Sequence, residues 1–272
     1  MRPVKKALAL IFVLALLSVG GAQAITYGQP DGNNHPNVGA MLRLRPSDNM
    51  YRIVCSGSLI SPTVFLTASH CTSFVQSFDP PYNQAWVTFD STFTSSTTLP
   101  SSAIHGTMYT NPNYNQAQSD PGDIAVIVLD QAVSGVDPVD LPTAGLLDQM
   151  KADGTLRGTQ FTSVGYGIQE PQPGPGGIVN AFPMERWYAA GTFWALNPSW
   201  LRISQNQATG SGGTCSGDSG GPQFLGAGSN ETTTQVSITI TGDVFCFATN
   251  VDYRLDTPSA RTFLSGFGVP LP

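Results

Sequence analysis

The chain has 272 residues, 40% of them hydrophobic, which is enough to fold into one large domain or two of ordinary size. Only 11% of the residues are charged, the formal net charge is −6, and the sequence contains no long charged or low-complexity block. This composition is that of a folded globular protein and is unsuited to binding nucleic acid or an anionic membrane surface, so we expect neither partner.

The first 24 residues have the pattern of an export signal. Arg2, Lys5 and Lys6 precede the apolar run ALALIFVLALLSV, and the tripeptide AQA ends at Ala24. We therefore expect residues 1–24 to be a signal peptide cleaved after Ala24, and the protein to be secreted, either extracellular or periplasmic. A membrane anchor is the alternative, but the apolar run is short for a span and no stop-transfer flank follows it. Loss of these three basic residues leaves 9 Lys plus Arg against 18 Asp plus Glu, a net charge of −9.

The remaining sequence favours short strands separated by turns. Apolar and polar residues alternate in several segments that are bounded by Gly, Pro, Asn and Ser, and these segments predict strands: 49–60, 84–90, 159–167 and 235–241. The segment DIAVIVL, 123–129, is apolar on both faces and predicts a buried strand. Helical signal is confined to 146–152 and to SARTFL, 259–264, while QEPQPGPGG, 169–177, predicts a surface loop. We expect an all-β protein of closed or sandwiched sheets with a short C-terminal helix.

One region is the best candidate for an internal boundary. Turn-forming residues gather in SGVDPVDLPTAG, 134–145, and the strand signal lapses there. We therefore divide the chain after the signal peptide into a first part, residues 25–137, and a second part, residues 138–272.

The four cysteines indicate two disulfides, because an exported chain meets an oxidising compartment. Three pairings are possible, and we favour Cys55–Cys71 with Cys215–Cys246 because both bonds close compact local loops. Metal binding is the rival use of these cysteines. The sequence has no CxxC pair and only three histidines, so we expect no metal and no cofactor.

The most informative segment is TCSGDSGGP, 214–222, because its central serine has the surroundings of a nucleophile. A serine hydroxyl is reactive only when a base takes its proton and a third group orients that base. The stretch GDSGG also fits G-x-S-x-G, the nucleophile elbow of α/β-hydrolases. In that fold the histidine follows the serine, whereas no histidine lies after His105 here, so the elbow interpretation fails.

Among the three histidines, His70 is the best candidate for the base. It precedes Cys71 in LTASHC, where a disulfide would hold its backbone, whereas His35 lies in a predicted turn and His105 has no special neighbours. The orienting carboxylate should be buried, and Asp123 opens the most apolar strand of the chain. Asp120 and Asp130 remain rivals, and Asp123 as a simple cap of its strand remains the alternative.

Together, LTASHC, DIAVIVL and GDSGGP, in the order His, Asp, Ser, resemble the trypsin-like (chymotrypsin-fold) serine proteases. The spacing agrees over almost the whole chain after residue 24, and the last motif is highly specific. The resemblance implies two six-stranded antiparallel β-barrels with the active site in the cleft between them. It also implies that Ser219 is the nucleophile, His70 the general base and acid, and Asp123 its partner, with the N–H groups of Gly217 and Ser219 forming the oxyanion hole.

The resemblance also implies a role for Asp218, the carboxylate next to the nucleophile. In this family it pairs with a newly formed N-terminal amine. Cleavage after Ala24 would create such an amine at Ile25, so we expect an Ile25–Asp218 pair and an enzyme that signal removal alone makes competent. The alternative is that Ile25 begins a loose tail and that Asp218 is satisfied in another way.

The pocket that selects substrates departs from the family pattern. The residue six positions before the nucleophile is Gly213, followed by Thr214, so the carboxylate that selects Arg and Lys is missing there. On the walls, Gly242 and Asp243 replace the usual residues, and Val251 takes the place of a glycine if Tyr253 matches the family tyrosine. We expect a shallow pocket for small or medium neutral residues, with attraction of a basic group by Asp243 as the alternative.

The function expected from the resemblance is that of a divergent secreted endopeptidase, a monomer that acts on polypeptides. Two other functions are weighed beside it: a non-catalytic binding module on the same fold, and an esterase that uses the same triad.

Overall fold

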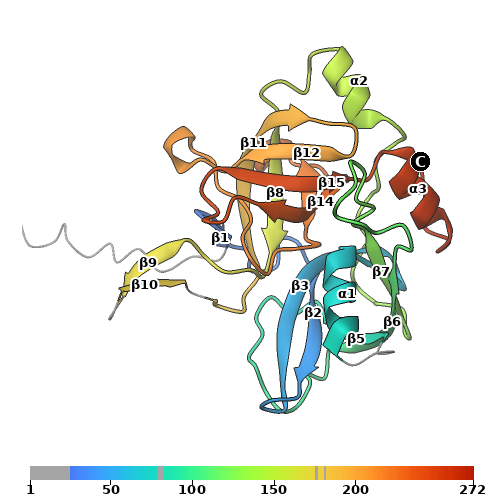
Figure 1. The fold of residues 1–272 in the computed structure, drawn as a ribbon, viewed down its shortest axis with the longest axis vertical. Helices are drawn as coiled ribbons and strands as arrows, with labels where there is room; N and C mark the ends of the chain where they lie inside the picture. Colours follow the sequence, from blue (N-terminus) through green and yellow to red (C-terminus); the bar gives the residue numbers. More distant parts are fainter. Residues whose placement is uncertain (1–24, 79–82, 175–176, 181) are drawn as a thin grey trace, which may run out of the picture.

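The computed structural model describes residues 25–78, 83–174, 177–180 and 182–272, so the expected signal peptide lies outside the described residues. Within these ranges the chain forms two closed antiparallel β-barrels of six strands each (Figure 1). The expected fold class, all-β with two such barrels, is confirmed.

The first barrel has the strand order β2-β3-β4-β7-β6-β5 and closes where β2 pairs with β5. Its strands are β2 (Val38–Arg45), β3 (Met50–Ser61), β4 (Val64–Thr67), β5 (Gln84–Thr88), β6 (Ile104–Thr110) and β7 (Ala125–Leu129). As its composition predicts, β7 is buried over most of its length. The interior is apolar, and burial of such side chains is the main stabilising contribution to a barrel of this size.

The second barrel has the order β11-β12-β15-β14-β13-β8 and closes where β11 pairs with β8. Its strands are β8 (Gln160–Gly165), β11 (Trp187–Leu196), β12 (Trp200–Ser204), β13 (Pro222–Leu225), β14 (Gln235–Gly242) and β15 (Thr249–Arg254). Alternation in β14 correctly predicts a strand. However, Ser237 and Thr239 on its polar face are as buried as Val236 and Ile238, because both faces of this strand are covered.

Each end of the described part of the chain contacts the barrel formed mainly by the other half of the sequence. Strand β1 (Gln29–Pro30) pairs with β11, and Thr26 forms a bridge with Gly213, so the segment that begins at Ile25 lies on the second barrel. At the other end, Phe267 contacts Tyr109 of β6 in the first barrel. Residue 137, the expected boundary, lies between β7 and β8, and residues 26–30 pair with the second barrel.

Two of the three α-helices in the described residues were predicted. Helix α2 (Leu146–Ala152) has the expected bounds, and α3 (Pro258–Ser265) includes SARTFL. The start of α3 explains why it forms there: the side chain of Thr257 accepts a hydrogen bond from the N–H of Ala260, and Pro258 occupies the first turn. Helix α1 (Ser69–Phe78) was not predicted, because a half-cystine and a threonine on its buried side hide the helical pattern.

The structure corrects the prediction for the Pro- and Gly-rich segment after β8, which was expected to be a surface loop. Strands β9 (Pro171–Gly174) and β10 (Gly177–Asn180) pair with each other in a separate two-stranded sheet. Figure 1 shows this hairpin extending away from both barrels. Proline is tolerated here because each strand has only one paired edge.

Candidate active site

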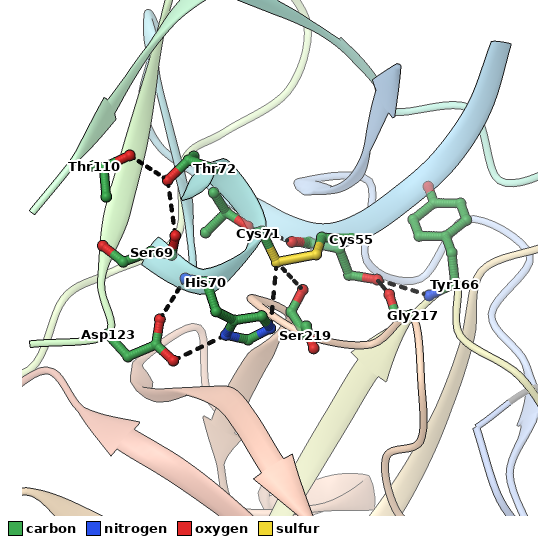
Figure 2. The surroundings of a disulfide bond; sticks show 12 residues. Cys55, Ser69, His70, Cys71, Thr72, Thr110, Asp123, Tyr166, Gly217 and Ser219 are labelled. Atoms are coloured by element: carbon green, nitrogen blue, oxygen red, sulfur yellow. Dashed lines mark hydrogen bonds and ion pairs between the residues drawn. A yellow bond between two sulfur atoms is a disulfide. The ribbon is translucent and has the colours of Figure 1, made fainter. Parts of the chain in front are cut away.

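A histidine–carboxylate pair lies where the two barrels meet. His70 is the second residue of α1, and Asp123 stands just before β7. The backbone N–H of His70 donates to Asp123 Oδ1 at 2.8 Å, and His70 Nδ1 lies 2.9 Å from Asp123 Oδ2 (Figure 2). Asp123 is buried, with 2% of its surface exposed, so its two contacts with one residue fix both the position and the orientation of the imidazole ring.

Ser69 connects the two segments that carry this pair. Its hydroxyl donates to the carbonyl oxygen of Ile124 at 2.7 Å and accepts from the N–H of Asn111 at 3.0 Å. The start of α1 is thereby bonded to the residue that follows Asp123.

The Cys55–Cys71 disulfide lies next to the imidazole ring of His70, and the pairing is the expected one. Cys71 Sγ is 3.6 Å from His70 Nε2 and 3.8 Å from the carbonyl oxygen of Ser219. The disulfide therefore links α1, which carries the imidazole ring of His70, to β3. Its Cys71 sulfur also contacts the turn that carries Ser219. The sulfur atoms and the ring nitrogen lie close enough for a shared metal, but a disulfide leaves no thiolate to bind one.

Ser219 lies beside His70, on the side of the ring away from Asp123 (Figure 2). Its hydroxyl forms no hydrogen bond within the described part of the chain, and such contacts often tighten only when a substrate is bound. The rival carboxylates are placed elsewhere. Asp120 accepts from the hydroxyl of Tyr253 at 2.8 Å, and Asp130 pairs with His105 at 2.6 Å.

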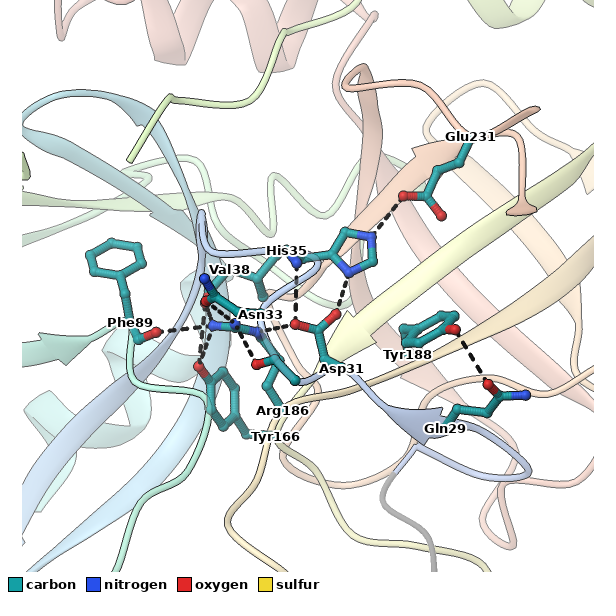
Figure 3. A network of polar contacts seen from close by, with 11 residues as sticks. Gln29, Asp31, Asn33, His35, Val38, Phe89, Tyr166, Arg186, Tyr188 and Glu231 are labelled. Carbon is teal, nitrogen blue, oxygen red and sulfur yellow. Dashed lines mark hydrogen bonds and ion pairs between the residues drawn. The ribbon is translucent and has the colours of Figure 1, made fainter. Parts of the chain in front are cut away.

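The remaining histidine, His35, belongs to a separate polar network (Figure 3). Its Nδ1 contacts Asp31, and its Nε2 lies 2.7 Å from Glu231 Oε1. Burial opposes protonation, but hydrogen bonds to Asp31 and Glu231 outweigh it and raise the pKa of His35 to about 9. His35 is therefore a structural cation.

The turn before Ser219 presents two unused backbone donors. Gly217 has a φ of +99°, a conformation that favours glycine. Within the described residues, the N–H groups of Gly217 and Ser219 donate to no acceptor. The turn is held from the first barrel by Ser56, whose N–H donates to the Ser219 carbonyl at 2.9 Å and whose hydroxyl donates to the Gly217 carbonyl at 3.0 Å. Ser56 Oγ also accepts from the N–H of Tyr166 at 2.9 Å.

Asp218 points away from the serine into the second barrel. Its Oδ1 accepts from the N–H of Gly167 at 2.7 Å and its Oδ2 from the N–H of Cys215 at 2.9 Å. Complete burial raises the pKa of Asp218 to about 7, although these two backbone donors partly offset the effect. Among the described residues it forms no ion pair. A Cβ on Gly165 would come within 2.2 Å of its Oδ1, so the space around the carboxylate is closely filled.

Ile25 is fully buried against Trp187 and Ala189 of β11. Next to it, the N–H of Gly213 donates to the Thr26 carbonyl at 3.0 Å, and the Thr26 hydroxyl donates to the Gly213 carbonyl at 3.1 Å. Ile25 is thus no loose tail. In the full-length chain its nitrogen belongs to a peptide bond, and no Ile25–Asp218 contact forms in the described part of the chain.

A pocket of about 370 Å³ opens beside Ser219. Three of the residues expected to form a selectivity pocket line it: Thr214, Gly242 and Asp243. The carboxylate of Asp243 bends back to its own loop, where it accepts from the N–H groups of 247, 248 and 249 at 2.8–3.0 Å. These donors outweigh the effect of burial and lower the pKa of Asp243, so it stays ionised at neutral pH.

The other two expected residues do not line this pocket. Gly213 lies behind it, against Gln205. Val251 lines a second pocket, with His70 and Asp123, because an irregularity between Thr239 and Thr241 shifts the pairing of β14 with β15. In that register Asp252 is opposite Thr239, a residue of the first pocket.

Several residues of the site were not found from the sequence. Ser56 and Ser69 act through hydrogen bonds to segments that are far apart in the chain, and Thr239 lines the pocket of Ser219 from β14. The position of Ser69 next to His70 was the one local signal that pointed to any of them.

Comparison with known proteins agrees with this geometry. A family model described as Trypsin matches residues 29–257, which include His70, Asp123 and Ser219. A search of the curated proteins finds no match.

Proposed function

Because the chain belongs to the trypsin family of serine proteases, we propose that it is a secreted endopeptidase that cleaves peptide bonds through an acyl-enzyme on Ser219. The observation that carries the proposal is the buried Asp123–His70 pair, with Ser219 on the other side of the imidazole and two unused N–H groups in the serine's own turn.

In the proposed mechanism His70 Nε2 takes the proton of the Ser219 hydroxyl while Oγ attacks the carbonyl carbon of the substrate. Asp123 holds the Nδ1–H tautomer and stabilises the imidazolium that forms. The substrate oxygen becomes an oxyanion and accepts hydrogen bonds from the N–H groups of Gly217 and Ser219. One such donor typically contributes about 3 kcal/mol to stabilising the transition state.

Collapse of the tetrahedral intermediate then breaks the C–N bond, and His70 gives its proton to the leaving amine. A water molecule enters, loses a proton to His70, and attacks the ester carbonyl. The second intermediate releases the carboxylic acid product, and the proton returns to Ser219 Oγ, which restores the starting state.

We further propose that the amine of Ile25, once exposed by cleavage after Ala24, pairs with Asp218 and fixes the turn of Gly217. Two observations support this. Asp218 is a fully buried carboxylate with no cationic partner in the described chain, and the pairing of Thr26 with Gly213 already holds Ile25 in the second barrel. A buried carboxylate without a partner is costly, and an ammonium group would relieve that cost.

Secretion is supported by the two disulfides, which persist in oxidising compartments. Among the described residues, no helix is long and apolar enough to cross a membrane.

Turnover of matched substrates tests the proposed function. The form that begins at Ile25 should cleave internal bonds of a mixed peptide library, and Ser219→Ala should abolish cleavage. Ser265→Ala, at an exposed serine of α3, is the matched control and should cleave like wild type. Cleavage of esters without peptides would favour an esterase, and turnover of neither class would favour a binding module.

A further inference from the structure

An arginine without a partner borders the second pocket, the one that His70 and Asp123 also line. This pocket has a volume of about 410 Å³, and its wall includes Arg202, Ile240, Thr241 and Val251. Arg202 is exposed on β12 and forms no hydrogen bond or ion pair with any described residue. By contrast, Arg186 and Arg254 each form buried ion pairs. Because a guanidinium stays charged at neutral pH and carries five N–H donors, Arg202 gives this pocket an unused cation.

The register of three neighbouring strands explains why Arg202 faces the pocket (Figure 1). Side chains alternate along β12, with Leu201 and Ile203 buried in the barrel and Arg202 exposed between them. Arg202 is opposite Val251 of β15, and Val251 is opposite Thr241 of β14. Residues that are opposite each other in antiparallel strands have their side chains on the same face. The three side chains therefore form a row on the outside of the second barrel, and this row is one wall of the pocket.

The second pocket adjoins the pocket of Ser219. Ile240 and Thr241, at the end of β14, line both of them. In the proposed function, a peptide whose reacting carbonyl lies at Ser219 must pass this shared wall. Successive side chains of an extended peptide point to opposite sides, so one residue can enter the pocket of Ser219 while a nearby residue reaches the second pocket.

The charges around the second pocket favour an anion. Asp123 is the one carboxylate among its described lining residues, and both of its oxygens already accept hydrogen bonds from His70. In the neighbouring pocket, the carboxylate of Asp243 is likewise bonded to its own loop. The charge of Arg202 has no such partner. A carboxylate matches a guanidinium in shape, because its two oxygens can accept two parallel N–H bonds.

We propose that Arg202 selects substrates that carry an aspartate or glutamate close to the cleaved bond, by pairing with that carboxylate in the second pocket. This inference rests on the proposed function and narrows its substrate class. It is independent of the residue preferred by the pocket of Ser219, which Arg202 does not line. The ion pair is present both in the bound substrate and in the transition state, so it lowers KM more than it raises kcat.

The test starts from a peptide that the enzyme cleaves. A single glutamate is moved through the three residues on each side of the cleaved bond, and each peptide is compared with its glutamine and lysine counterparts. In wild type, glutamate at one position should raise kcat/KM about fivefold over glutamine, mainly through KM, with lysine lowest. Arg202→Gln should remove this preference, Arg202→Lys should keep part of it, and Arg202→Glu should favour lysine instead. These variants should fold, because Arg202 is exposed and bonds no described residue.

Arg157→Gln is the matched control. Arg157 is also exposed, but it lies in the turn between α2 and β8 and does not line the second pocket. This variant should leave the glutamate-to-glutamine ratio of kcat/KM unchanged. Higher ionic strength should reduce the difference in that ratio between wild type and Arg202→Gln, because salt screens exposed charges. Inhibition constants of peptide aldehydes with the same sequences make the comparison without turnover.

The outcomes distinguish this inference from the proposed function. A glutamate-to-glutamine ratio near one at every position in wild type overturns the inference and leaves the proposed function intact. So does a ratio that Arg202→Gln does not change, or that Arg157→Gln lowers equally. No cleavage of any peptide by a protein whose Ser219 does not react with a phosphonate overturns both.

Discussion

Ser56 of the first barrel donates its hydroxyl to the carbonyl oxygen of Gly217, which lies 161 residues later in the sequence. Through its own N–H it also holds the carbonyl of Ser219 at 2.9 Å. One residue of β3 therefore holds the carbonyl groups of both residues whose N–H groups are proposed to stabilise the oxyanion.

Ser56→Ala removes two bonds of the hydroxyl, the one to the Gly217 carbonyl and the one from the N–H of Tyr166, and keeps the backbone bond to Ser219. We expect kcat to fall about 10-fold, the effect of losing roughly 1.4 kcal/mol from the bond to Gly217, with little change in KM. Binding of a peptide aldehyde, whose adduct places an oxyanion at this turn, should weaken in parallel. Steady-state kinetics and inhibition constants check this.

Ser58→Ala is the matched control for that variant. Ser58 is two residues away on β3 and also donates to the second barrel, to Gln235 Oε1 at 2.5 Å, but it does not contact the turn. It should lower the free energy of unfolding and leave kcat within about twofold of wild type, since a lost neutral hydrogen bond acts mainly on stability. An equal loss of kcat in both variants would mean that Ser56 acts only by joining the barrels.

The N-terminus gives the second prediction. A form that begins at Ile25 should be active, and a form with one extra residue before Ile25 should lose at least 100-fold in kcat/KM. The reason is that a buried carboxylate without its ammonium partner costs about 3–5 kcal/mol. The turn of Gly217 would rearrange to relieve that cost, and the N–H groups proposed to bind the oxyanion would then be misplaced. Peptide hydrolysis by the two purified forms measures the effect.

Asp218→Asn is the companion variant, because it removes the same pair from the other side. It should lower activity in the form that begins at Ile25 and change the extended form little. Full activity of the extended form would show that Asp218 needs no N-terminal amine.

The third prediction concerns Asp123. Asp123→Asn keeps the shape of the side chain but favours the wrong tautomer of His70, so kcat should fall by the roughly 10⁴-fold that this change causes in serine protease triads. Asp120→Asn, three residues earlier, removes a carboxylate that bonds Tyr253 and should retain most of the activity. Comparable losses of kcat in Asp123→Asn and Asp120→Asn would contradict the proposal that Asp123 is the carboxylate that orients His70.

The fourth prediction concerns pH and the network of His35 in Figure 3. The guanidinium of Arg186 is buried there, donating to Asp31 Oδ2 at 2.7 Å and to the Val38 carbonyl at 2.9 Å, so the network joins the N-terminal segment to both barrels. The pKa of His35 is raised to about 9, above its ordinary value of 6.5. Its contribution to stability is therefore fully present below pH 6.5 and is lost as pH rises through about 9.

The size of that contribution is on the order of 3 kcal/mol. Urea unfolding of wild type at pH 6 and pH 9.5 should show a loss of this order, and His35→Gln should be less stable at pH 6 with a much flatter pH dependence. An equally steep decline in His35→Gln would assign the effect to other groups.

Short motifs predicted most of the fold and of the site. Alternation marked the long strands, and LTASHC, DIAVIVL and GDSGGP each carry one residue of a cluster that the structure brings together. Both disulfides were also predicted, because each joins cysteines that are close in the chain. These features depend on local residue order, which a single sequence shows directly.

The features that sequence reasoning missed depend on register and on distant contacts. The irregularity at Ile240 moves the β14–β15 pairing by one residue, and a shift of one reverses which side chains face the pocket. Val251 therefore lines the pocket of His70 and Asp123, not the pocket of Ser219 in which it was expected. Ser56 is a serine among other small residues of β3, and nothing near it in the sequence indicates a bond to Gly217.

The most direct test of the central claim is covalent labelling of the form that begins at Ile25 with a peptidyl phosphonate, followed by intact-mass measurement and peptide mapping. The account predicts one adduct, on Ser219, that forms rapidly in wild type, far more slowly in His70→Ala, and not at all in Ser219→Ala. Labelling that is absent in wild type, or that is equally fast in His70→Ala, would contradict it.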